Sequence, residues 1–349
     1  MHIPDGYLSP ATCGVMYATM IPLWAASSRI MNKTLSAKQA PLLAMSAAFS
    51  FLIMMFNVPI IGGTTGHAVG ATLVAIVLGP WAACISVSIA LVIQAFLFGD
   101  GGISALGANC FNMAFVMPFV GYYVYKAISA GAPADSKRRW IAAGVAGYVS
   151  LVTASAVAGF EFGIQPALAH DAAGHALYCP YALGTSLAAM VGGHALVFGW
   201  VEAIVTGLVV AFLGRTEPDL VAWSRPDTAI LARPARLLVG LAVLVIACPL
   251  GLILPELFKA GDAWGEWSPE DLGKIVGYVP QGLKRLSELW SAPLPDYTVK
   301  GLDSAGRTGA SIGYIISAVV GVCICAIAII LVGKFLLRKR TNATADSKP

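Results

Sequence analysis

The chain has 349 residues, of which 58% belong to the apolar set and only 11% are charged. An ordinary soluble domain has roughly 25% charged residues, so the composition excludes a disordered chain and a plain soluble fold. The formal net charge is +4, and the Lys and Arg residues cluster in short loops instead of forming one basic face. Nucleic acid is therefore not the expected partner, and membrane lipid is the expected surrounding.

Apolar runs of about 17 to 25 residues can cross the hydrocarbon core of a membrane, which is about 30 Å thick. Such runs occur at about residues 11–30, 39–59, 81–98, 103–128, 140–160, 185–213, 236–256 and 309–333. A further run, from His67 to Gly79, is too short to cross alone, and Gly79-Pro80 closes it with a turn. We predict an all-α, polytopic membrane protein with about nine membrane segments, of which this one is a half-length helix.

The basic residues predict the orientation of these segments, because Lys and Arg prefer cytoplasmic loops. They follow the first, fifth, seventh and last segments, as Arg29, Lys33 and Lys38; Lys137, Arg138 and Arg139; Arg215, Arg225, Arg233 and Arg236; and Lys334, Arg338, Lys339 and Arg340. All four groups share the cytoplasmic side only if the N-terminus is outside and the short run from His67 to Gly79 counts as a crossing. The C-terminus is then cytoplasmic.

The arginine-rich stretch divides the chain into two membrane modules. We predict a body, a cytoplasmic linker, a module of two transmembrane helices joined by an extracytoplasmic loop, and a disordered tail, at residues 1–213, 214–235, 236–340 and 341–349. The loop of the second module contains Ser268-Pro269-Glu270-Asp271, which is typical of the start of a short amphipathic helix. Its Trp residues, Trp264 among them, suit the membrane surface.

The first two residues form a potential metal chelate. A free α-amine, one intervening peptide N–H and the imidazole of His2 can close fused chelate rings on one metal ion. Deprotonating that amide requires a strongly polarising d-block ion, and a planar set of nitrogens favours Ni(II) or Cu(II), with Co(II) possible at some cost. A single His is more often a satisfied polar residue, so His2 by itself is a weak signal.

The chelate requires that Met1 stays as the first residue. The sequence MHIPDGYLSP lacks the basic and apolar regions of a secretory signal peptide, and methionine removal is generally limited to small second residues. A fourth nitrogen must come from elsewhere, and His67 is the best placed. It starts the half-length helix on the outer side, after a glycine-rich stretch that lets backbones approach closely. The positive end of a helix dipole disfavours a nearby cation, and this effect opposes metal binding at the start of the half-length helix.

Polar residues that are unusual at membrane depth surround the predicted site. They are Asp5, Thr64, Thr65, Gln94, Asp100, Asn109 and Asn112. Two interpretations stay open: hydrogen bonding between helices inside the bundle, or a layer behind the ligands that orients them and holds the N-terminal loop. Asp5 in particular has an alternative to metal binding, because it can cap or pin this loop.

Four further residues have open roles. His170 and His175 share a loop with Asp171 and could collect metal loosely at the mouth, although a solvated loop is the simpler interpretation. Glu202 lies mid-span, two helical turns from His194, so both can lie on one helix face. That pair could couple transport to protons or ions, form a packing hydrogen bond, or contact a partner subunit.

At these residues the sequence resembles the CbiM/NikM family, the cobalt and nickel substrate-binding S-components of energy-coupling-factor (ECF) transporters. The motifs that carry the resemblance are MHIPDGYLSP at 1–10, GGTTGHAVGA at 62–71, QAFLFGDGGISALGANCFNMAFVMPFVGYY at 94–123 and GGHALVFGWVEAIVTGLVVAF at 192–212. The segment from 236 onward, with LPDYTVKGLD at 294–303, resembles the small CbiN or NikN companion subunit, here fused into one chain.

The resemblance implies that the Met1 amine, the amide and imidazole nitrogens of His2 and the imidazole of His67 hold Ni²⁺ or Co²⁺ as transported substrate, with no organic cofactor. It also implies partners, a transmembrane T-component (CbiQ or NikQ) and two ATPase subunits (CbiO or NikO), in the plasma membrane of a prokaryote. The chain itself has no Walker A loop, so we expect a transport component and not an enzyme.

Pro4-Asp5 replaces the Met-Glu that is usual in cobalt members and favours nickel. The alternatives are a cobalt importer that supplies cobalamin biosynthesis, a self-sufficient secondary transporter in which Glu202 and His194 relay protons, and a membrane metalloenzyme.

Overall fold

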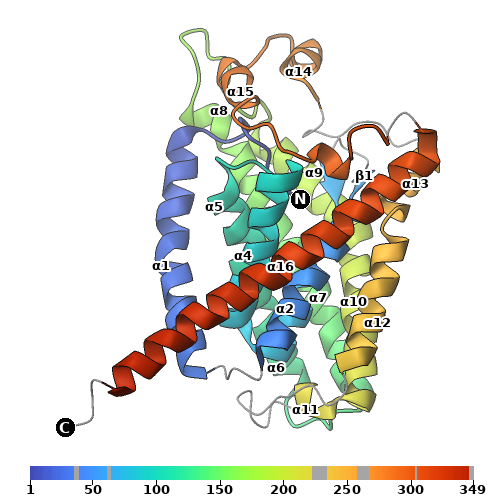
Figure 1. Ribbon diagram of the computed structural model, residues 1–349. Coiled ribbons are helices and arrows are strands. Elements are labelled where there is room, and N and C mark those ends of the chain that lie inside the picture. Colours follow the sequence, from blue (N-terminus) through green and yellow to red (C-terminus); the bar gives the residue numbers. More distant parts are fainter. Residues whose placement is uncertain (35–38, 61–63, 222–233, 258–266, 303–304, 346–349) are drawn as a thin grey trace.

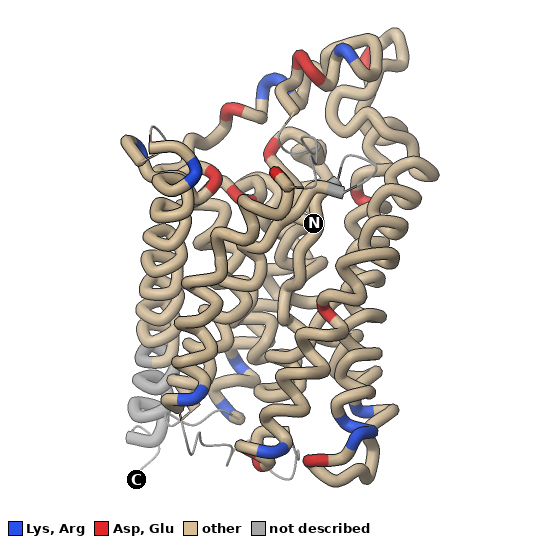
Figure 2. The backbone as a smooth tube through the Cα atoms, turned by 90° about the vertical axis from the view of Figure 1, so that its right-hand side faces the viewer, with Lys and Arg blue, Asp and Glu red and all other residues tan. Residues whose placement is uncertain are grey.

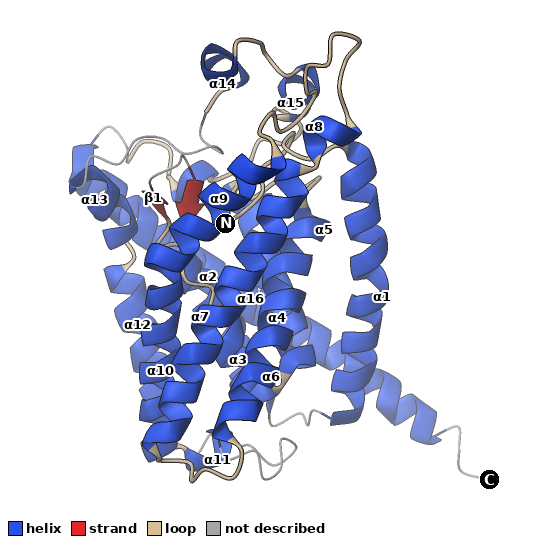
Figure 3. Ribbon diagram, turned by 180° about the vertical axis from the view of Figure 1, so that it is seen from behind, coloured by secondary structure: helices blue, strands red, loops and turns tan. Residues whose placement is uncertain are grey.

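The computed structural model describes residues 1–34, 39–60, 64–221, 234–257, 267–302 and 305–345. Long helices form a bundle, and the short elements α8, α14 and α15 lie together at one end of it (Figure 1). The N-terminus folds into the bundle near that end, next to the strands, as the view from behind also shows (Figure 3). The C-terminus lies at the opposite end, where Figure 2 shows several Lys and Arg segments.

The body consists of helices, three of which contain π-helical segments, here labelled η. Its elements are α1 (Pro10–Thr34), α2 (Ala40–Met54), α3 (Ala71–Leu78), α4 (Pro80–Ile93), η2 (Gln94–Phe98), α5 (Leu106–Asn109), η3 (Cys110–Val116), α6 (Met117–Ser129), α7 (Lys137–Gly163), α8 (Gln165–Leu168), α9 (Leu183–Gly193), η4 (His194–Phe198), α10 (Gly199–Thr216) and α11 (Pro218–Val221). The π-helical segments continue α4, α5 and α9 without a gap in the chain.

Four helices in the described part of the chain are long and apolar enough to cross a membrane, and a fifth if a bent pair counts as one span. They are 80–98, 137–168, 183–216 and 306–333, and the bent pair is 234–247 with 250–257. The chain is therefore a multi-pass helical membrane protein. The nine segments and their orientation remain predictions.

Helix α3 is shorter than the predicted run from His67 to Gly79. It begins at Ala71 and has 8 residues, which corresponds to about 12 Å and cannot cross a membrane alone. Residues 67–70 precede it in a non-helical conformation, and Gly70 has a φ of 72°. Because this φ is left-handed, it is readily adopted only by glycine. Every side chain of α3 is buried, so α3 forms the interior of the bundle.

Two short strands correct the prediction of a purely helical chain. The run 39–59 was predicted as one helix, but α2 ends at Met54 and is followed by β1 (Val58–Ile60). Strand β1 pairs antiparallel with β2 (Thr64–Gly66), with Val58 opposite Gly66. Pro59 lacks a backbone N–H and cannot continue a helix interior. The hairpin turns the chain from α2 back into the bundle, just before His67.

The second module contains α12 (Pro234–Ala247), α13 (Leu250–Leu257), α14 (Pro269–Val276), α15 (Gln281–Leu286), the 3₁₀ turn η5 (Pro295–Tyr297) and α16 (Gly306–Ala345). Helices α12 and α13 bend by 41°. The predicted helix start at Ser268 is confirmed, because its hydroxyl accepts the Asp271 N–H at 3.1 Å. Helix α16 crosses the bundle diagonally in Figure 1 and contacts α2 and α4.

The prediction of a disordered tail at 341–349 is wrong for residues 341–345, because α16 continues to Ala345. The residues before them, Lys339 and Arg340 among them, have high helix propensity, and residues 341–345 continue that helix. Residues 346–349, most of the predicted linker (222–233) and Trp264 lie outside the described residues.

Candidate metal centre

The N-terminal loop, residues 1–9, is folded into the bundle. The side chains of Met1 and Ile3 are buried, with 2% and 0% of their surface exposed. The Met1 amine donates a hydrogen bond to the carbonyl of Thr65 in β2, at 3.1 Å. Burial lowers the pKa of this amine to about 5, so the amine is neutral at pH 7 and retains its lone pair. The chain start therefore lies next to the segment that carries His67.

The imidazoles of His2 and His67 stack on each other. Their ring centroids are 4.7 Å apart and the ring planes differ by 27°. The Nδ1 atom of His67 lies 3.1 Å from the carbonyl of Ala68. The Nε2 atoms of both rings are buried and have no hydrogen-bond partner among the described residues. An imidazole nitrogen in this state is available as a metal ligand, since buried polar atoms are otherwise almost always paired.

Asp100 connects His2 to a second polar cluster. Its Oδ1 lies 2.8 Å from Nδ1 of His2, and its Oδ2 accepts a hydrogen bond of 2.6 Å from the hydroxyl of Tyr297. Gln94, the first residue of η2, donates to the same hydroxyl at 2.9 Å. Tyr297 stacks on Phe98, with a ring-centroid distance of 4.7 Å. A side chain of the second module thus takes part in the surroundings of His2.

Asn109 and Gly102 hold the backbone at Ile3. The Asn109 amide accepts the Ile3 N–H at 2.8 Å and donates to the Ile3 carbonyl at 3.0 Å. The Gly102 N–H donates to the same carbonyl at 2.8 Å. A Cβ at position 102 would lie 2.3 Å from the backbone nitrogen of Asp5. Only glycine therefore lets the two loops pack this closely.

Asp5 pins the N-terminal loop from its other side. Its carboxylate accepts the N–H groups of Ile103 and Ser104 at 3.0 and 2.8 Å, and also the hydroxyl of Ser104. All of these partners belong to the 99–104 turn between η2 and α5. Of the two roles that the sequence left open for Asp5, the structure thus favours loop anchoring over metal binding.

Three further residues were predicted to lie behind the ligands, namely Thr64, Thr65 and Asn112, and the structure places them differently. Thr65 contributes its backbone carbonyl, and the side chain of Thr64 lies outside the described part of the chain. Asn112 lies elsewhere, because its amide donates to Glu161 of α7 at 2.7 Å. Asn112 is buried in the seven-residue η3, which contacts α7. Its assignment to the layer behind the ligands is therefore not supported by its contacts.

The loop histidines are exposed and engaged locally. His175 Nδ1 lies 3.3 Å from Asp171 Oδ2, and its ring stacks on Tyr278 at 4.4 Å. His170 Nδ1 lies 3.2 Å from the Asp171 carbonyl. These contacts agree with a loop that is closed by its own polar groups.

Glu202 and His194 each use other partners. His194 Nδ1 lies 2.7 Å from the carbonyl of Met190. The Glu202 carboxylate accepts the N–H groups of Val69 and Gly70, at 2.8 and 3.1 Å, and the hydroxyl of Thr206 at 3.3 Å. The helical spacing that placed both residues on one face ignores η4, which changes the periodicity between them.

Sequence reasoning missed Tyr297 and the backbone amides of the 99–104 turn. The motif LPDYTVKGLD carried a signal for Tyr297, but nothing local indicates which part of the body it contacts. The described residues contain no cluster of three or more His, Cys, Asp or Glu side chains suited to a metal. Among the described residues, the amine at the chain start lies beside the stacked imidazoles of His2 and His67.

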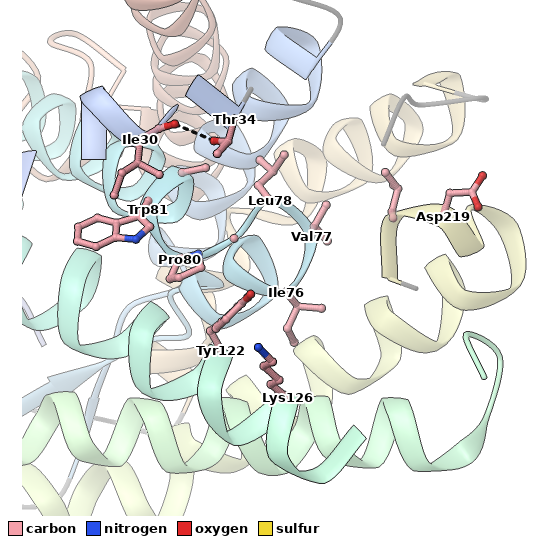
Figure 4. A pocket seen from close by; sticks show the side chains of 13 residues that line it. Ile30, Thr34, Ile76, Val77, Leu78, Pro80, Trp81, Tyr122, Lys126 and Asp219 are labelled. Atoms are coloured by element: carbon pink, nitrogen blue, oxygen red, sulfur yellow. Dashed lines mark hydrogen bonds between the residues drawn. The ribbon is translucent and has the colours of Figure 1, made fainter. Parts of the chain in front are cut away.

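A cavity of about 350 Å³ lies at the far end of α3 from His67. It is lined by Ile76, Val77 and Leu78 of α3, by Tyr122 and Lys126 of α6, and by Asp219 (Figure 4). None of the predicted metal ligands contributes to it, so this cavity is separate from the candidate centre.

The fold and the site together define a multi-pass membrane protein whose buried chain start and two imidazoles form a nitrogen-rich centre. The sequence profile of the CbiM family, described as the cobalt uptake substrate-specific transmembrane region, matches residues 2–220, and a PDGLE domain matches residues 236–338. The chain therefore belongs to the CbiM/NikM family of transition metal transport proteins and carries a fused CbiN-like C-terminal module.

Full-length relatives share this two-part organisation. A fused nickel transport protein of Rhodobacter capsulatus is 48% identical over 339 residues, which cover 93% of this chain and 94% of that protein. A probable fused nickel transport protein of Lactiplantibacillus plantarum is 44% identical over 335 residues, 93% of this chain and 95% of its own. A crystal structure of a transition metal transporter, 50% identical, superposes with a TM-score of 0.59 and covers 64% of this chain and 98% of its own.

Proposed function

We propose that this protein captures Ni²⁺ outside the plasma membrane of a prokaryote and delivers it inward as the substrate-binding component of an ATP-driven ECF-type importer. The ligands are the Met1 amine, the amide and imidazole nitrogens of His2 and the imidazole of His67. The observation that carries the proposal is the burial of the Met1 amine beside the stacked His2 and His67 rings.

Ring size supports this ligand set. The amine and the His2 amide nitrogen close a five-membered ring on a metal, and the amide nitrogen and Nδ1 of His2 close a six-membered ring. In the structure Nδ1 faces Asp100, so metal binding requires that Nδ1 exchange the carboxylate for the ion. His67 Nε2, which has no partner among the described atoms, completes the set.

The donor set favours nickel over cobalt. Amide-containing sets of nitrogens in one plane suit Ni(II) geometry. The relatives that match over nearly the whole chain are named as nickel transport proteins. Pro4-Asp5 in place of Met-Glu points the same way.

The topology and domain division extend the same proposal. Nine segments with the N-terminus outside place the metal site on the extracytoplasmic side and the basic end of the bundle in the cytoplasm. The body is residues 1–213, the linker 214–235 and the second module 236–340. Capture then occurs at the side where the N-terminal loop lies.

The energy source distinguishes this proposal from a secondary transporter. A T-component and two ATPase subunits supply ATP hydrolysis, and uptake by cells that express them should stop when the ATPase is inactivated. Uptake by this chain alone, driven by a proton gradient, would favour the secondary transporter instead. The relay that such a transporter needs is not supported, because Glu202 and His194 make their hydrogen bonds to other groups.

The ligand set is tested by comparing two histidines. His67→Ala removes one of four ligands, and its Ni²⁺ affinity in detergent should fall by at least about 100-fold, since even residues behind the ligands cost about 10- to 100-fold. His170→Ala removes an exposed imidazole and should leave affinity within about threefold. Competition with Co²⁺ on the same purified chain measures the metal preference. Equal losses for the two variants would reject the assignment of His67.

A further inference from the structure

Glu202 is a fully buried carboxylate in the middle of α10, with 0% of its surface exposed. Its partners are the backbone N–H groups of Val69 and Gly70, both on Oε2, and the Thr206 hydroxyl on Oε1. Val69 and Gly70 lie two and three residues after His67. A side chain of α10 therefore binds the backbone that carries a proposed metal ligand.

These hydrogen bonds satisfy backbone N–H groups at the start of α3. The first N–H groups of any helix lack partners within the helix, and inside a bilayer no water is available to satisfy them. Gly70, the residue before α3, has no side chain with which to cap it. The Glu202 carboxylate, on another helix, accepts the N–H of Gly70 at this end and that of Val69 just before it, and its negative charge suits a helix N-terminus.

A second contact holds the same segment on the other side of His67. A Cβ added to Gly66 would lie 2.0 Å from the ring of Phe198, so the Gly66 backbone packs directly on this ring. Phe198 ends η4 and is continuous with α10. Phe198 contacts this segment at Gly66, just before His67, and Glu202 binds it at Val69 and Gly70, just after His67. Segment 66–70 is therefore fixed to the continuous helix formed by η4 and α10.

We infer that Glu202 is a positioning residue that fixes the His67 imidazole at the metal site by binding the 69–70 backbone to α10. This inference rests on the proposed function, because it assumes that His67 is a ligand. The position of His67 then depends on α10, and a displacement of α10 relative to α3 that breaks these two hydrogen bonds withdraws the fourth ligand while the chelate of Met1 and His2 remains.

The test compares three variants of the full chain for Ni²⁺ affinity and for the visible absorption spectrum of the bound ion. Glu202→Ala removes the acceptor and should weaken binding by about 10- to 100-fold, with a spectrum that approaches that of His67→Ala. Glu202→Gln keeps a carbonyl oxygen for the two N–H groups and should restore affinity to within about threefold. Glu161→Ala removes another buried carboxylate, one that bonds Asn112, and should leave both readouts unchanged.

A double variant separates positioning from a general loss of stability. In the His67→Ala background, Glu202→Ala should add no further loss of affinity, because the ligand through which Glu202 acts is already absent. A full additional loss there, an unchanged affinity in the single variant, or a failure of Glu202→Gln to restore binding would overturn the inference. If Glu202→Ala does not fold, Glu202→Asp replaces it, since it withdraws the carboxylate by one methylene and should weaken binding in the same direction.

The two proposals fail in different ways. If His67→Ala itself binds Ni²⁺ normally, the ligand set of the proposed function is wrong. If His67→Ala loses affinity but Glu202→Ala and Glu202→Asp do not, the proposed function stands and only the role of Glu202 is wrong.

Discussion

The imidazole of His2 contacts the body directly and is connected to the second module through Asp100. One ring face stacks on His67 of the body, and Nδ1 faces Asp100, whose other oxygen is held by Tyr297 of the second module. Hydrogen bonds to a charged carboxylate contribute about 1.5–3 kcal/mol, so Tyr297 restricts where the Asp100 carboxylate can lie. The orientation of His2 thus depends on a residue almost 300 positions away in the sequence.

Tyr297→Phe tests this dependence. The substitution removes only the hydroxyl, so the ring still stacks on Phe98, but Asp100 loses a donor. We expect the Ni²⁺ affinity of the purified chain to fall by about tenfold, the lower end of the range for residues behind metal ligands, because an Asp100 carboxylate without this donor holds Nδ1 of His2 more strongly and competes with the ion for it. Isothermal titration measures the change.

The matched control is Tyr278→Phe. The Tyr278 hydroxyl accepts the Ala176 N–H in the loop that carries His170 and His175, and its removal should leave Ni²⁺ affinity unchanged. An affinity in Tyr297→Phe equal to that of the native chain would mean that the hydroxyl does not affect the site.

The N-terminal loop and the 99–104 turn form one unit. Asp5 and Ile3 connect them by hydrogen bonds from Ile103, Ser104 and Gly102 of the turn, and the close approach at Gly102 leaves no room for a side chain. A loop that is already ordered loses less conformational entropy when it binds an ion. Under the proposed function, this pairing of loops orders the chain start before it binds the ion.

Gly102→Ala should separate the two loops. Its methyl group would overlap the backbone of Asp5, so the N-terminal loop must shift, and we expect Ni²⁺ affinity to fall by at least about tenfold while the helix content measured by circular dichroism stays the same. Gly14→Ala is the control, because nothing lies within 4 Å of its added Cβ. Equal affinities for the two variants would show that the contact at Gly102 is unimportant for binding.

Local patterns predicted the long helices, because hydropathy is encoded in short stretches of sequence. Chelate chemistry also singled out His2 and His67, and the structure brings these two imidazoles together; their role as ligands stays a prediction. The lead-in 67–70 and the hairpin were missed, since apolar residues such as Val58 and Ile60 suit a buried strand as well as a helix. The contact between Tyr297 and Asp100 is set by tertiary packing between two distant parts of the chain, so no local sequence pattern predicts it. The same holds for Glu202, whose partners are backbone groups without a sequence signature.

The second module packs along the body and also reaches Asp100, which lies beside His2. Helix α16 contacts α2 and α4, Leu294 donates a backbone hydrogen bond to Leu97, and Trp290 donates to the carbonyl of Phe96. The two hydrogen bonds fall on η2, a few residues before Asp100. In this structure the 290–297 loop of the second module therefore lies beside the segment that leads to Asp100.

The central claim is that the first residue of the chain is itself a metal ligand, and an N-terminal extension tests it most directly. One added residue before Met1 converts the amine into an amide and removes a nitrogen donor from the chelate, while His2, His67 and the helices stay unchanged. Measured as Ni²⁺ bound per purified chain in a competition titration, tight binding should be lost in the extended protein and should return when a protease removes the added residue. Undiminished binding by a folded, extended chain would contradict the assignment of the amino-terminal site.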